Sequence, residues 1–317
     1  MKRKLRILLF LLVALLSFNL SREVVQAKTI VKAVSLYNNN ILQETKYGTL
    51  QGKLAENDKV LVWEGVPYAK AERWKAPETL EKWDGIFDAT KAGKVGVQLS
   101  GKDVIGDENC LNLDIFRPNT LEKDLPIIVY IHGGNNQSGT SKEINPEKLA
   151  INTNSIVISV NYRLGLFGFN NLPSLKTGNK LEDSGNYTLL DIAKSLDWVK
   201  ENADYFGGNG KNITISGFSA GGRDVMAMLI SPTFQGKFQK AVSFSGGMTI
   251  ADKAASEKVF AKAIAPLAVQ DNIKKNEQEA YKWLLTKDPA VKTYLYGIKA
   301  ERLAPLMGNA GIRMSVF

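Results

Sequence analysis

The sequence predicts an α/β fold, in which a mostly parallel central sheet carries helices on both faces. Two apolar runs, Pro126–Ile131 and Ile156–Val160, are continuous and end at turn-forming residues. Such runs are typical of strands buried on both faces of a parallel sheet. Between residues 186 and 206 the apolar residues instead recur at helical spacing. Strands that alternate with helices in this way indicate an α/β architecture.

Short strands are predicted first in the chain. Residues 32–76 contain turn-bounded segments of this type at Gly48–Gly52 and Val60–Trp63. The runs at 126–131 and 156–160 follow as central strands. Because 44% of the 317 residues are hydrophobic, we expect one large domain rather than several.

Helices become prominent in the second half of the chain. The helix predicted for residues 186–206 has one apolar face, made by Leu189, Ile192, Ala193, Leu196, Val199 and Ala203, and Gly207-Gly208 ends it. A strand at 213–216, an all-apolar buried helix at 225–230 and a strand at 241–244 are predicted next. Residues 251–287 are rich in Ala, Lys and Glu, and we expect amphipathic helices there.

The N-terminus has the pattern of a secretory signal peptide. Met1–Arg6 is basic, Ile7–Leu16 is apolar, and Val25-Gln26-Ala27 supplies small residues for cleavage. A membrane anchor is the alternative, but the apolar run is shorter than the roughly 18–20 residues that a span needs. We therefore expect residues 1–27 to be a signal peptide and 28–317 to be the exported domain, secreted or extracytoplasmic, with no stable membrane span after cleavage.

Charge and cysteine content exclude several classes of partner. Without residues 1–27 the chain has 36 basic and 31 acidic side chains, a net charge of +5, which gives no argument for nucleic-acid binding. Cys110 is the single cysteine, so no internal disulfide can form, and we expect it to be a buried small apolar residue. The sequence has no Cys/His cluster of the kind that binds structural zinc, and we predict no metal site.

A candidate nucleophile lies in Gly217-Phe218-Ser219-Ala220-Gly221, between a predicted strand and a predicted helix. A tight strand-to-helix turn leaves no room for side chains beside the serine and directs its hydroxyl into the cleft above the sheet. The positive N-terminal end of the following helix favours negative charge there. A phosphate-binding or purely structural turn is the alternative interpretation.

A glycine-rich loop, His132-Gly133-Gly134-Asn135, follows directly on the strand at 126–131. Its backbone N–H groups, together with that of Ala220, could form an oxyanion hole, which stabilises the charge that develops on a carbonyl oxygen. His132 is the only histidine in the chain. A structural role in holding the loop is favoured for it over a buried core histidine and over a general base.

These segments belong to a longer series in which the chain resembles the type-B carboxylesterases, the family of the bacterial p-nitrobenzyl-type esterases and the cholinesterases. The resemblance covers residues 47–250. The landmarks that carry it are Trp63–Ala69, Asp107–Leu113, Tyr130–Gly134, Ser159–Gly165, Trp198-Val199 with Phe206–Asn209, and Gly217–Gly222.

The resemblance implies an α/β-hydrolase fold and hydrolysis of small-molecule carboxylic esters without a cofactor. It implies that Ser219 is the nucleophile and that the amides of Gly134, Asn135 and Ala220 form the oxyanion hole. The family usually has Gly or Ala where this chain has Asn135. Phe218 replaces the acidic residue of the cholinesterases, so nothing favours a choline substrate. Thr188 and Ile192 also depart from the pattern.

The largest departure lies after Ser219. The resemblance implies a triad acid and a histidine well downstream, and no histidine follows Ser219 in this chain. We therefore expect residues 28–317 to be the N-terminal portion of the esterase domain, with its C-terminal part missing. An exported serine esterase whose base and acid lie elsewhere is the preferred interpretation. A catalytically inactive esterase-fold binding protein and a non-functional truncated product are the alternatives. The oligomeric state stays open.

Overall fold

A computed structural model describes residues 36–247, 250–306 and 314–315. The predicted signal peptide, residues 1–27, lies outside the described residues. The description below concerns the compact unit that begins at Tyr37.

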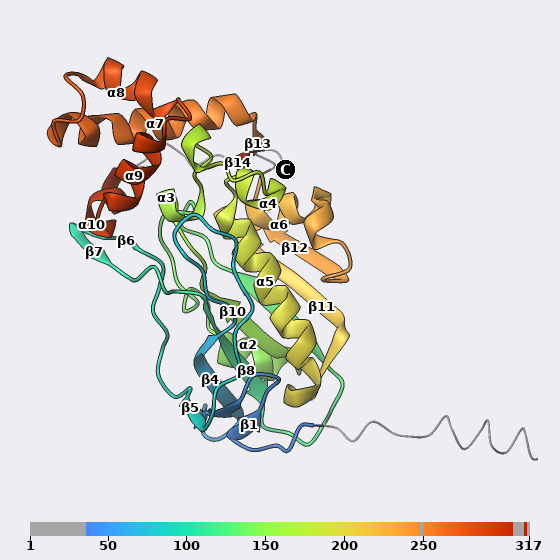
Figure 1. Cartoon of the computed structure of the whole chain (residues 1–317). Helices are drawn as coiled ribbons and strands as arrows, with labels where there is room; N and C mark the ends of the chain where they lie inside the picture. The colour runs from blue at the N-terminus through green and yellow to red at the C-terminus, as the bar shows by residue number, and fades with distance from the viewer. Residues whose placement is uncertain (1–35, 248–249, 307–313, 316–317) are drawn as a thin grey trace, which may run out of the picture. The chain divides into compact units, whose positions relative to one another are not determined.

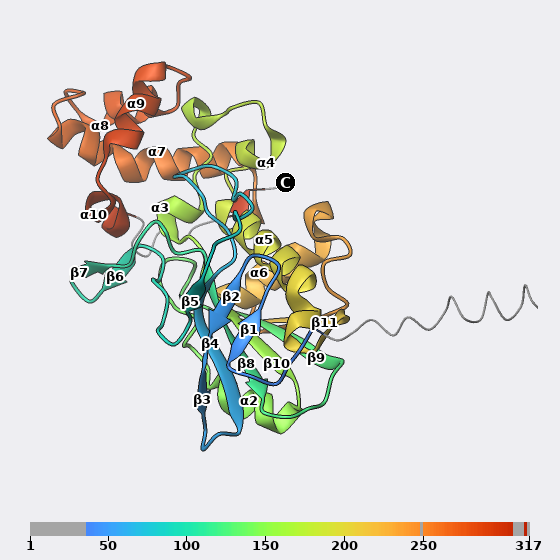
Figure 2. The same ribbon diagram turned by 60° about the horizontal axis from the view of Figure 1, so that its bottom comes forward.

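A seven-stranded sheet in the order β12-β11-β9-β10-β8-β4-β3 is the centre of this unit (Figures 1 and 2). Its strands are β3 (Lys53–Ala55), β4 (Val60–Pro67), β8 (Asn112–Pro118), β9 (Leu125–Ile131), β10 (Ile156–Val160), β11 (Gly208–Phe218) and β12 (Lys240–Phe244). Smaller sheets are formed by β1 (Leu42–Glu44), β2 (Thr49–Gln51) and β5 (Ile86–Asp88), by β6 (Gln98–Ser100) and β7 (Asp103–Ile105), and by β13 (Ile250–Ala251) and β14 (Met314–Ser315).

The pairing divides the large sheet into two halves. Neighbours among β12, β11, β9 and β10 are parallel. Neighbours from β10 through β8 and β4 to β3 are antiparallel. The predicted parallel strands are therefore confirmed, whereas the described sheet as a whole is mixed rather than mostly parallel. Two unpredicted strands cause the difference: β8 lies antiparallel between β10 and β4, and β3 pairs antiparallel with β4.

Helices cover both faces of the sheet, as predicted. The helices are α2 (Pro146–Thr153), α3 (Gly165–Gly168), α4 (Lys180–Asp183), α5 (Tyr187–Asn202), α6 (Ala220–Ile230), α7 (Lys253–Gln270), α8 (Glu277–Leu284), α9 (Pro289–Gly297) and α10 (Ala300–Leu303), with short 3₁₀ turns at Pro173–Leu175, Ala203–Phe206, Pro232–Phe234 and Ala304–Leu306. Helix α2 packs on Val60, Val62, Phe116 and Val157 of one face. Helices α5 and α6 contribute to the larger core on the other face.

Burial on both faces of the sheet explains why β10 is apolar on both of its sides. Along β10, Val157 faces the α2 core while Ile156 and Ile158 face the α5 and α6 core, so all three positions are apolar.

A buried ion pair fixes α5 to the loop after β10. The Arg163 guanidinium donates to both carboxylate oxygens of Asp191 at 2.6 and 2.8 Å. Both side chains are buried, so each charge depends on the other.

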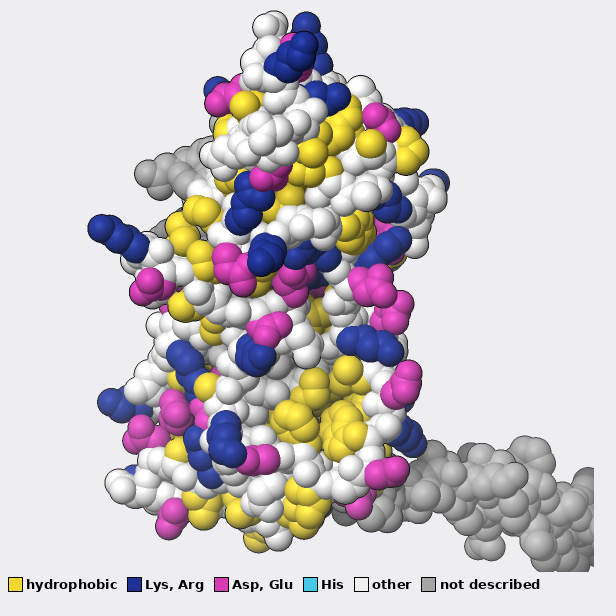
Figure 3. Space-filling model, turned by 60° about the vertical axis from the view of Figure 1, so that its left-hand side comes forward, with side chains coloured by type: hydrophobic (Ala, Val, Ile, Leu, Met, Phe, Trp, Pro, Cys, Tyr) yellow, Lys and Arg dark blue, Asp and Glu magenta, His cyan; other side chains and the backbone are white. Residues whose placement is uncertain are grey.

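Strand β12 pairs only with β11 among the described residues. Its side chains Val242 and Phe244 are exposed on the α2 side of the sheet, close to the exposed Phe218 of β11. On this side the described helices leave the β11–β12 part of the sheet uncovered. Elsewhere, on the face shown in Figure 3, basic and acidic side chains are interspersed, with hydrophobic patches between them.

None of the described helices is long and apolar enough to span a bilayer.

Candidate active site

Ser219 stands on a strained turn between β11 and α6. Its backbone has φ 54° and ψ −114°, and it is the N-cap residue of α6. A non-glycine residue rarely adopts positive φ, and such strain clusters at functional sites. The conformation is held on both sides, because the Ser219 N–H donates to Phe244 O (2.9 Å) and its carbonyl accepts from Arg223 N (3.0 Å). The tight strand-to-helix turn predicted from the sequence is thus present.

Glycines surround this turn because neighbouring backbone leaves no space for side chains. A Cβ on Gly217 would lie closer than 3.0 Å to the backbone of Gly221. A Cβ on Gly221 would lie equally close to the carbonyl oxygens of Ile131 and His132. Contacts below 3.0 Å essentially never occur for Cβ atoms, so the spacing Gly-x-Ser-x-Gly follows from packing of α6 against the end of β9.

The glycine-rich loop lies directly beside the nucleophile turn. A Cβ placed on Gly133 would lie 3.0 Å from Phe218 O and 3.3 Å from Ser219 Cβ. The structure therefore brings together the loop and the turn, which are 85 residues apart in sequence. All four predicted site residues, Ser219, Gly134, Asn135 and Ala220, belong to these two segments; their catalytic roles remain predictions.

The loop turns in a left-handed conformation. Gly134, Asn135 and Asn136 have φ of 82°, 56° and 56°. Gln137 and Ser138 both donate their N–H to Gly134 O, at 2.9 and 3.1 Å. Asparagine tolerates this backbone region better than other residues with a Cβ. The conformation therefore explains how Asn135 can stand where the family usually has Gly or Ala.

The three candidate oxyanion donors have unoccupied N–H groups. Among the described residues, neither Gly134 N nor Asn135 N donates to any acceptor, and Ala220 N is the first N–H of α6, which has no partner within the helix. In contrast, Gly133 N donates to Glu143 Oε2 at 2.8 Å. Glu143 also accepts from Tyr130 Oη at 2.8 Å. The sequence did not point to Glu143, because this residue lies in no recognisable motif.

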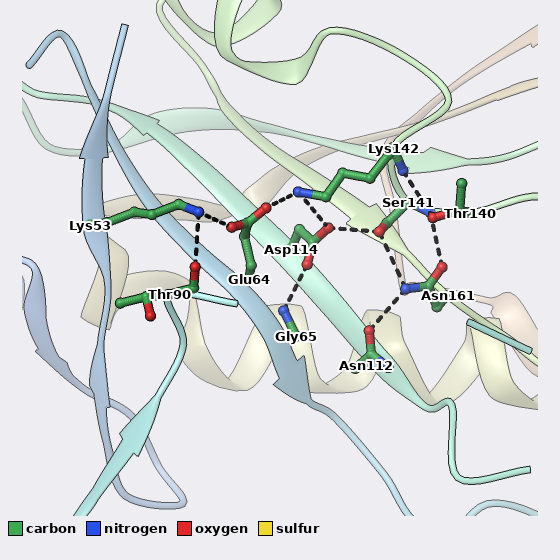
Figure 4. Close-up of polar contacts among 10 residues, drawn as sticks. All are labelled: Lys53, Glu64, Gly65, Thr90, Asn112, Asp114, Thr140, Ser141, Lys142 and Asn161. Atoms are coloured by element: carbon green, nitrogen blue, oxygen red, sulfur yellow. Dashed lines mark hydrogen bonds and ion pairs between the residues drawn. The ribbon is translucent and has the colours of Figure 1, made fainter. Parts of the chain in front are cut away.

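A buried polar network fixes the far end of the loop (Figure 4). Ser141 donates its hydroxyl to Asp114 Oδ2 at 2.6 Å, and its N–H donates to Asn161 Oδ1 at 2.9 Å. Lys142 pairs with Glu64, which also pairs with Lys53. Burial raises the pKa of Asp114 despite the hydrogen bonds that it accepts. The network ties the loop to β4, β8 and the end of β10.

His132 has the contacts of a structural residue. Its ring is buried and stacks on Tyr162 with centroids 4.2 Å apart. Its Nδ1 lies 3.0 Å from Gly133 O and 3.2 Å from Tyr162 Oη. Burial lowers the pKa of His132 to about 4. The ring therefore stays neutral at physiological pH, and its contacts favour the predicted role in holding the loop.

Comparison with known proteins decides the family. The sequence model of the carboxylesterase family matches residues 39–292. The chain belongs to the carboxylesterase family. Its similarity to the type-B branch is confirmed by the para-nitrobenzyl esterase of Bacillus subtilis, which is 38% identical over 242 residues, covering 72% of this chain and 48% of the relative. Venom carboxylesterase-6 of Apis mellifera is 36% identical, covering 63% of this chain and 37% of the relative.

Solved carboxylesterase structures confirm the α/β-hydrolase fold. Carboxylesterase EST55 of Geobacillus stearothermophilus aligns with a TM-score of 0.73 at 30% identity, covering 87% of this chain and 55% of that one. A para-nitrobenzyl esterase structure aligns with a TM-score of 0.66 at 33% identity, covering 83% and 55%. The chain spans half or less of the length of these two curated relatives, 48% and 37%.

A cavity of about 630 Å³ in this carboxylesterase chain lies on the α2 side of the sheet, next to the exposed β12. Phe218 and Phe244 contribute apolar walls, and Glu143 and Tyr130 contribute polar groups. Trp63 and Trp74 are buried in the core. Phe218 is exposed and lines this cavity.

Cys110 is fully buried, as predicted, and burial raises the pKa of its thiol. In the described part of the chain no three His, Cys, Asp or Glu side chains are grouped so as to hold a metal ion.

The lowered pKa of His132 predicts a pH dependence of stability. Between pH 6.5 and 4 the unfolded chain binds a proton on this histidine that the folded protein does not bind. The free energy of unfolding should therefore fall by about 3 kcal/mol as the pH drops through this window. Urea unfolding of wild type and His132→Gln at pH 7 and pH 4 isolates this contribution, because the other titrating groups are common to both. An equal loss of stability in the two proteins would contradict the prediction.

Proposed function

We propose that the chain is the nucleophile-bearing part of an exported serine carboxylesterase. The observation that carries the proposal is Ser219, which is held at φ 54° beside the glycine-rich loop. A serine kept in a strained conformation at the start of a helix is arranged for nucleophilic attack rather than for stability. The carboxylesterase relatives support hydrolysis of small-molecule esters.

In the proposed reaction the Ser219 hydroxyl oxygen attacks the ester carbonyl carbon, and a base takes the hydroxyl proton. The negative charge on the former carbonyl oxygen is stabilised by the N–H groups of Gly134, Asn135 and Ala220. Collapse of this intermediate breaks the bond to the alcohol, which leaves with the proton, and Ser219 keeps the acyl group. Water then attacks the acyl-enzyme, releases the carboxylic acid and returns the proton to Ser219.

The base and its acidic partner come, in this proposal, from sequence outside the 317 residues. His132 does not fit the part, because its ring is buried, neutral and engaged with Gly133 and Tyr162. A serine hydroxyl without a base is a poor nucleophile. The match covers 48% of the para-nitrobenzyl esterase. In this proposal, the base and the acid correspond to residues in the part of that relative that the chain does not cover.

Export rests on the basic, apolar and small-residue pattern of residues 1–27.

Turnover by the 317-residue chain alone tests where the base comes from. We expect this chain to hydrolyse p-nitrophenyl acetate no faster than its Ser219→Ala variant, because its single histidine, His132, is buried and engaged with Gly133 and Tyr162. Release of p-nitrophenol, followed by absorbance, measures this. Clear turnover that depends on Ser219 would contradict the external base and would assign that role to His132 or to a base other than histidine.

A further inference from the structure

A second buried pair joins the glycine-rich loop to helix α6. Asn136 lies in the left-handed turn of the loop, and Asp224 lies on α6, five residues after Ser219. Both side chains are buried. Asn136 Nδ2 donates to Asp224 Oδ1 at 3.0 Å. The bond joins two residues 88 positions apart, one next to the candidate donor Asn135 and the other on the helix that begins after Ser219.

The other oxygens of this pair have no partner. Asn136 Oδ1 and Asp224 Oδ2 are both buried without a hydrogen bond among the described residues. Rotating the Asn136 amide by half a turn would not satisfy these oxygens, because the amide oxygen would then face Asp224 Oδ1, which cannot donate when the carboxylate is ionised. Two unpaired buried oxygens on neighbouring side chains are costly when one side chain is an ionised carboxylate, since neither can donate.

One proton removes this conflict. A protonated Asp224 carries an O–H donor on Oδ2, and Asn136 Oδ1 is the unpaired acceptor on the side chain to which Asp224 is already bonded. The two groups can then form a carboxylic acid–amide pair with a hydrogen bond in each direction. We propose that Asp224 is a neutral acid in the folded protein, and that its pair with Asn136 positions the glycine-rich loop against the nucleophile helix.

The charges around Asp224 agree with this assignment. Burial raises the pKa of Asp224 to about 7, although the Asn136 hydrogen bond and the neighbouring Arg223 oppose the shift. Tyr162 faces Asp224 and brings no positive charge to it, because burial raises the pKa of Tyr162 and keeps it neutral. Arg223 does not pair with Asp224 in the structure; its guanidinium Nη2 lies 3.4 Å from Asn135 Oδ1 instead. Consecutive residues of α6 thus contact consecutive asparagines of the loop.

A role of this pair in catalysis rests on the proposed esterase function. The contact between Asn136 and Asp224 does not depend on that proposal. Asp224 is a positioning residue here, because it acts on Asn135 and Gly134 only through Asn136 and the turn. Above pH 7 Asp224 loses its proton and can no longer donate a hydrogen bond to Asn136. The glycine-rich loop should then be held less firmly against α6.

Infrared difference spectroscopy of the 317-residue chain tests the protonation state. At pH 6 the spectrum of wild type minus Asp224→Asn should show the carbonyl stretch of a protonated carboxylic acid. That band should disappear as the pH is raised through about 7. Asp204→Asn is the matched control, because Asp204 is exposed and its removal should leave the band unchanged. Absence of the band from wild type at pH 6 overturns the proposal.

Amide hydrogen exchange tests the positioning role. The Gln137 N–H, which closes the loop turn on Gly134 O, should exchange about tenfold faster in Asp224→Ala than in wild type at pH 6, the change expected for loss of one ordinary hydrogen bond. Asp224→Asn should restore slow exchange, because an amide can both donate to and accept from Asn136. Equal exchange in wild type and Asp224→Ala overturns the positioning role. Neither measurement uses ester hydrolysis, so failure of the esterase proposal would leave both readings intact.

Discussion

Replacing Ser219 by alanine in the protein made by its native host is expected to lower ester turnover by about 10⁶-fold, the size of effect seen when a hydrolase loses its nucleophilic serine. The reason is structural: Ser219 stands on the turn where β11 meets α6, beside the glycine-rich loop that carries the candidate oxyanion donors. In the proposed mechanism, alanine removes the hydroxyl oxygen that forms the acyl-enzyme. Hydrolysis of p-nitrophenyl butyrate by purified protein measures the change.

Ser100→Ala is a suitable control for this substitution, since Ser100 is exposed on β6, away from the turn. Its turnover should equal that of wild type. If Ser219→Ala kept more than a small fraction of wild-type turnover, the nucleophile would have to be another residue.

Gly221→Ala is expected to destabilise the folded chain by about 3 kcal/mol, the upper range for forcing extra volume into a packed site. On an exposed helix the same change would stabilise by about 1 kcal/mol, because alanine is the better helix former. Here the added methyl would collide with the carbonyl oxygens of Ile131 and His132, which are rigid backbone at the end of β9. Packing therefore outweighs helix propensity. Thermal unfolding followed by circular dichroism measures the difference.

Gly210→Ala provides the comparison for Gly221→Ala. Gly210 lies in β11, and a Cβ there would meet Ala203 Cβ at 3.4 Å and Lys200 O at 3.6 Å, which are ordinary contacts. This variant should unfold within a few degrees of wild type. Equal unfolding temperatures for the two variants would show that the close approach of α6 to β9 does not constrain residue 221.

The sequence could predict strands in which apolar residues predominate, and it could not predict β8. The run Ile156–Val160 has apolar residues on both faces, so its pattern is visible in isolation. Strand β8 is equally buried but contains Asp114 and Arg117, whose partners lie elsewhere in the chain. Charged residues normally indicate an exposed segment. Burying them costs free energy unless tertiary contacts supply hydrogen-bond partners, and those partners are not visible in the local sequence.

The site divides in the same way. Ser219 and the glycine-rich loop were recognisable because their backbone geometry demands glycine at fixed spacing. Glu143 and Asp224, which hold that loop, carry no local pattern. The contact between Asp224 and Asn136 spans 88 residues, and it exists only after β9 and β11 pair. Residues that support a site through tertiary contacts are therefore the part that sequence reasoning misses.

Covalent labelling of the protein purified from its native source tests the central claim most directly. A fluorophosphonate reacts only with an activated serine, and peptide mapping by mass spectrometry locates the label. The account predicts a single label on the peptide that contains Ser219. A protein that stays unlabelled while folded, or that carries its label on another serine, would contradict the proposal that Ser219 is the nucleophile of a carboxylesterase.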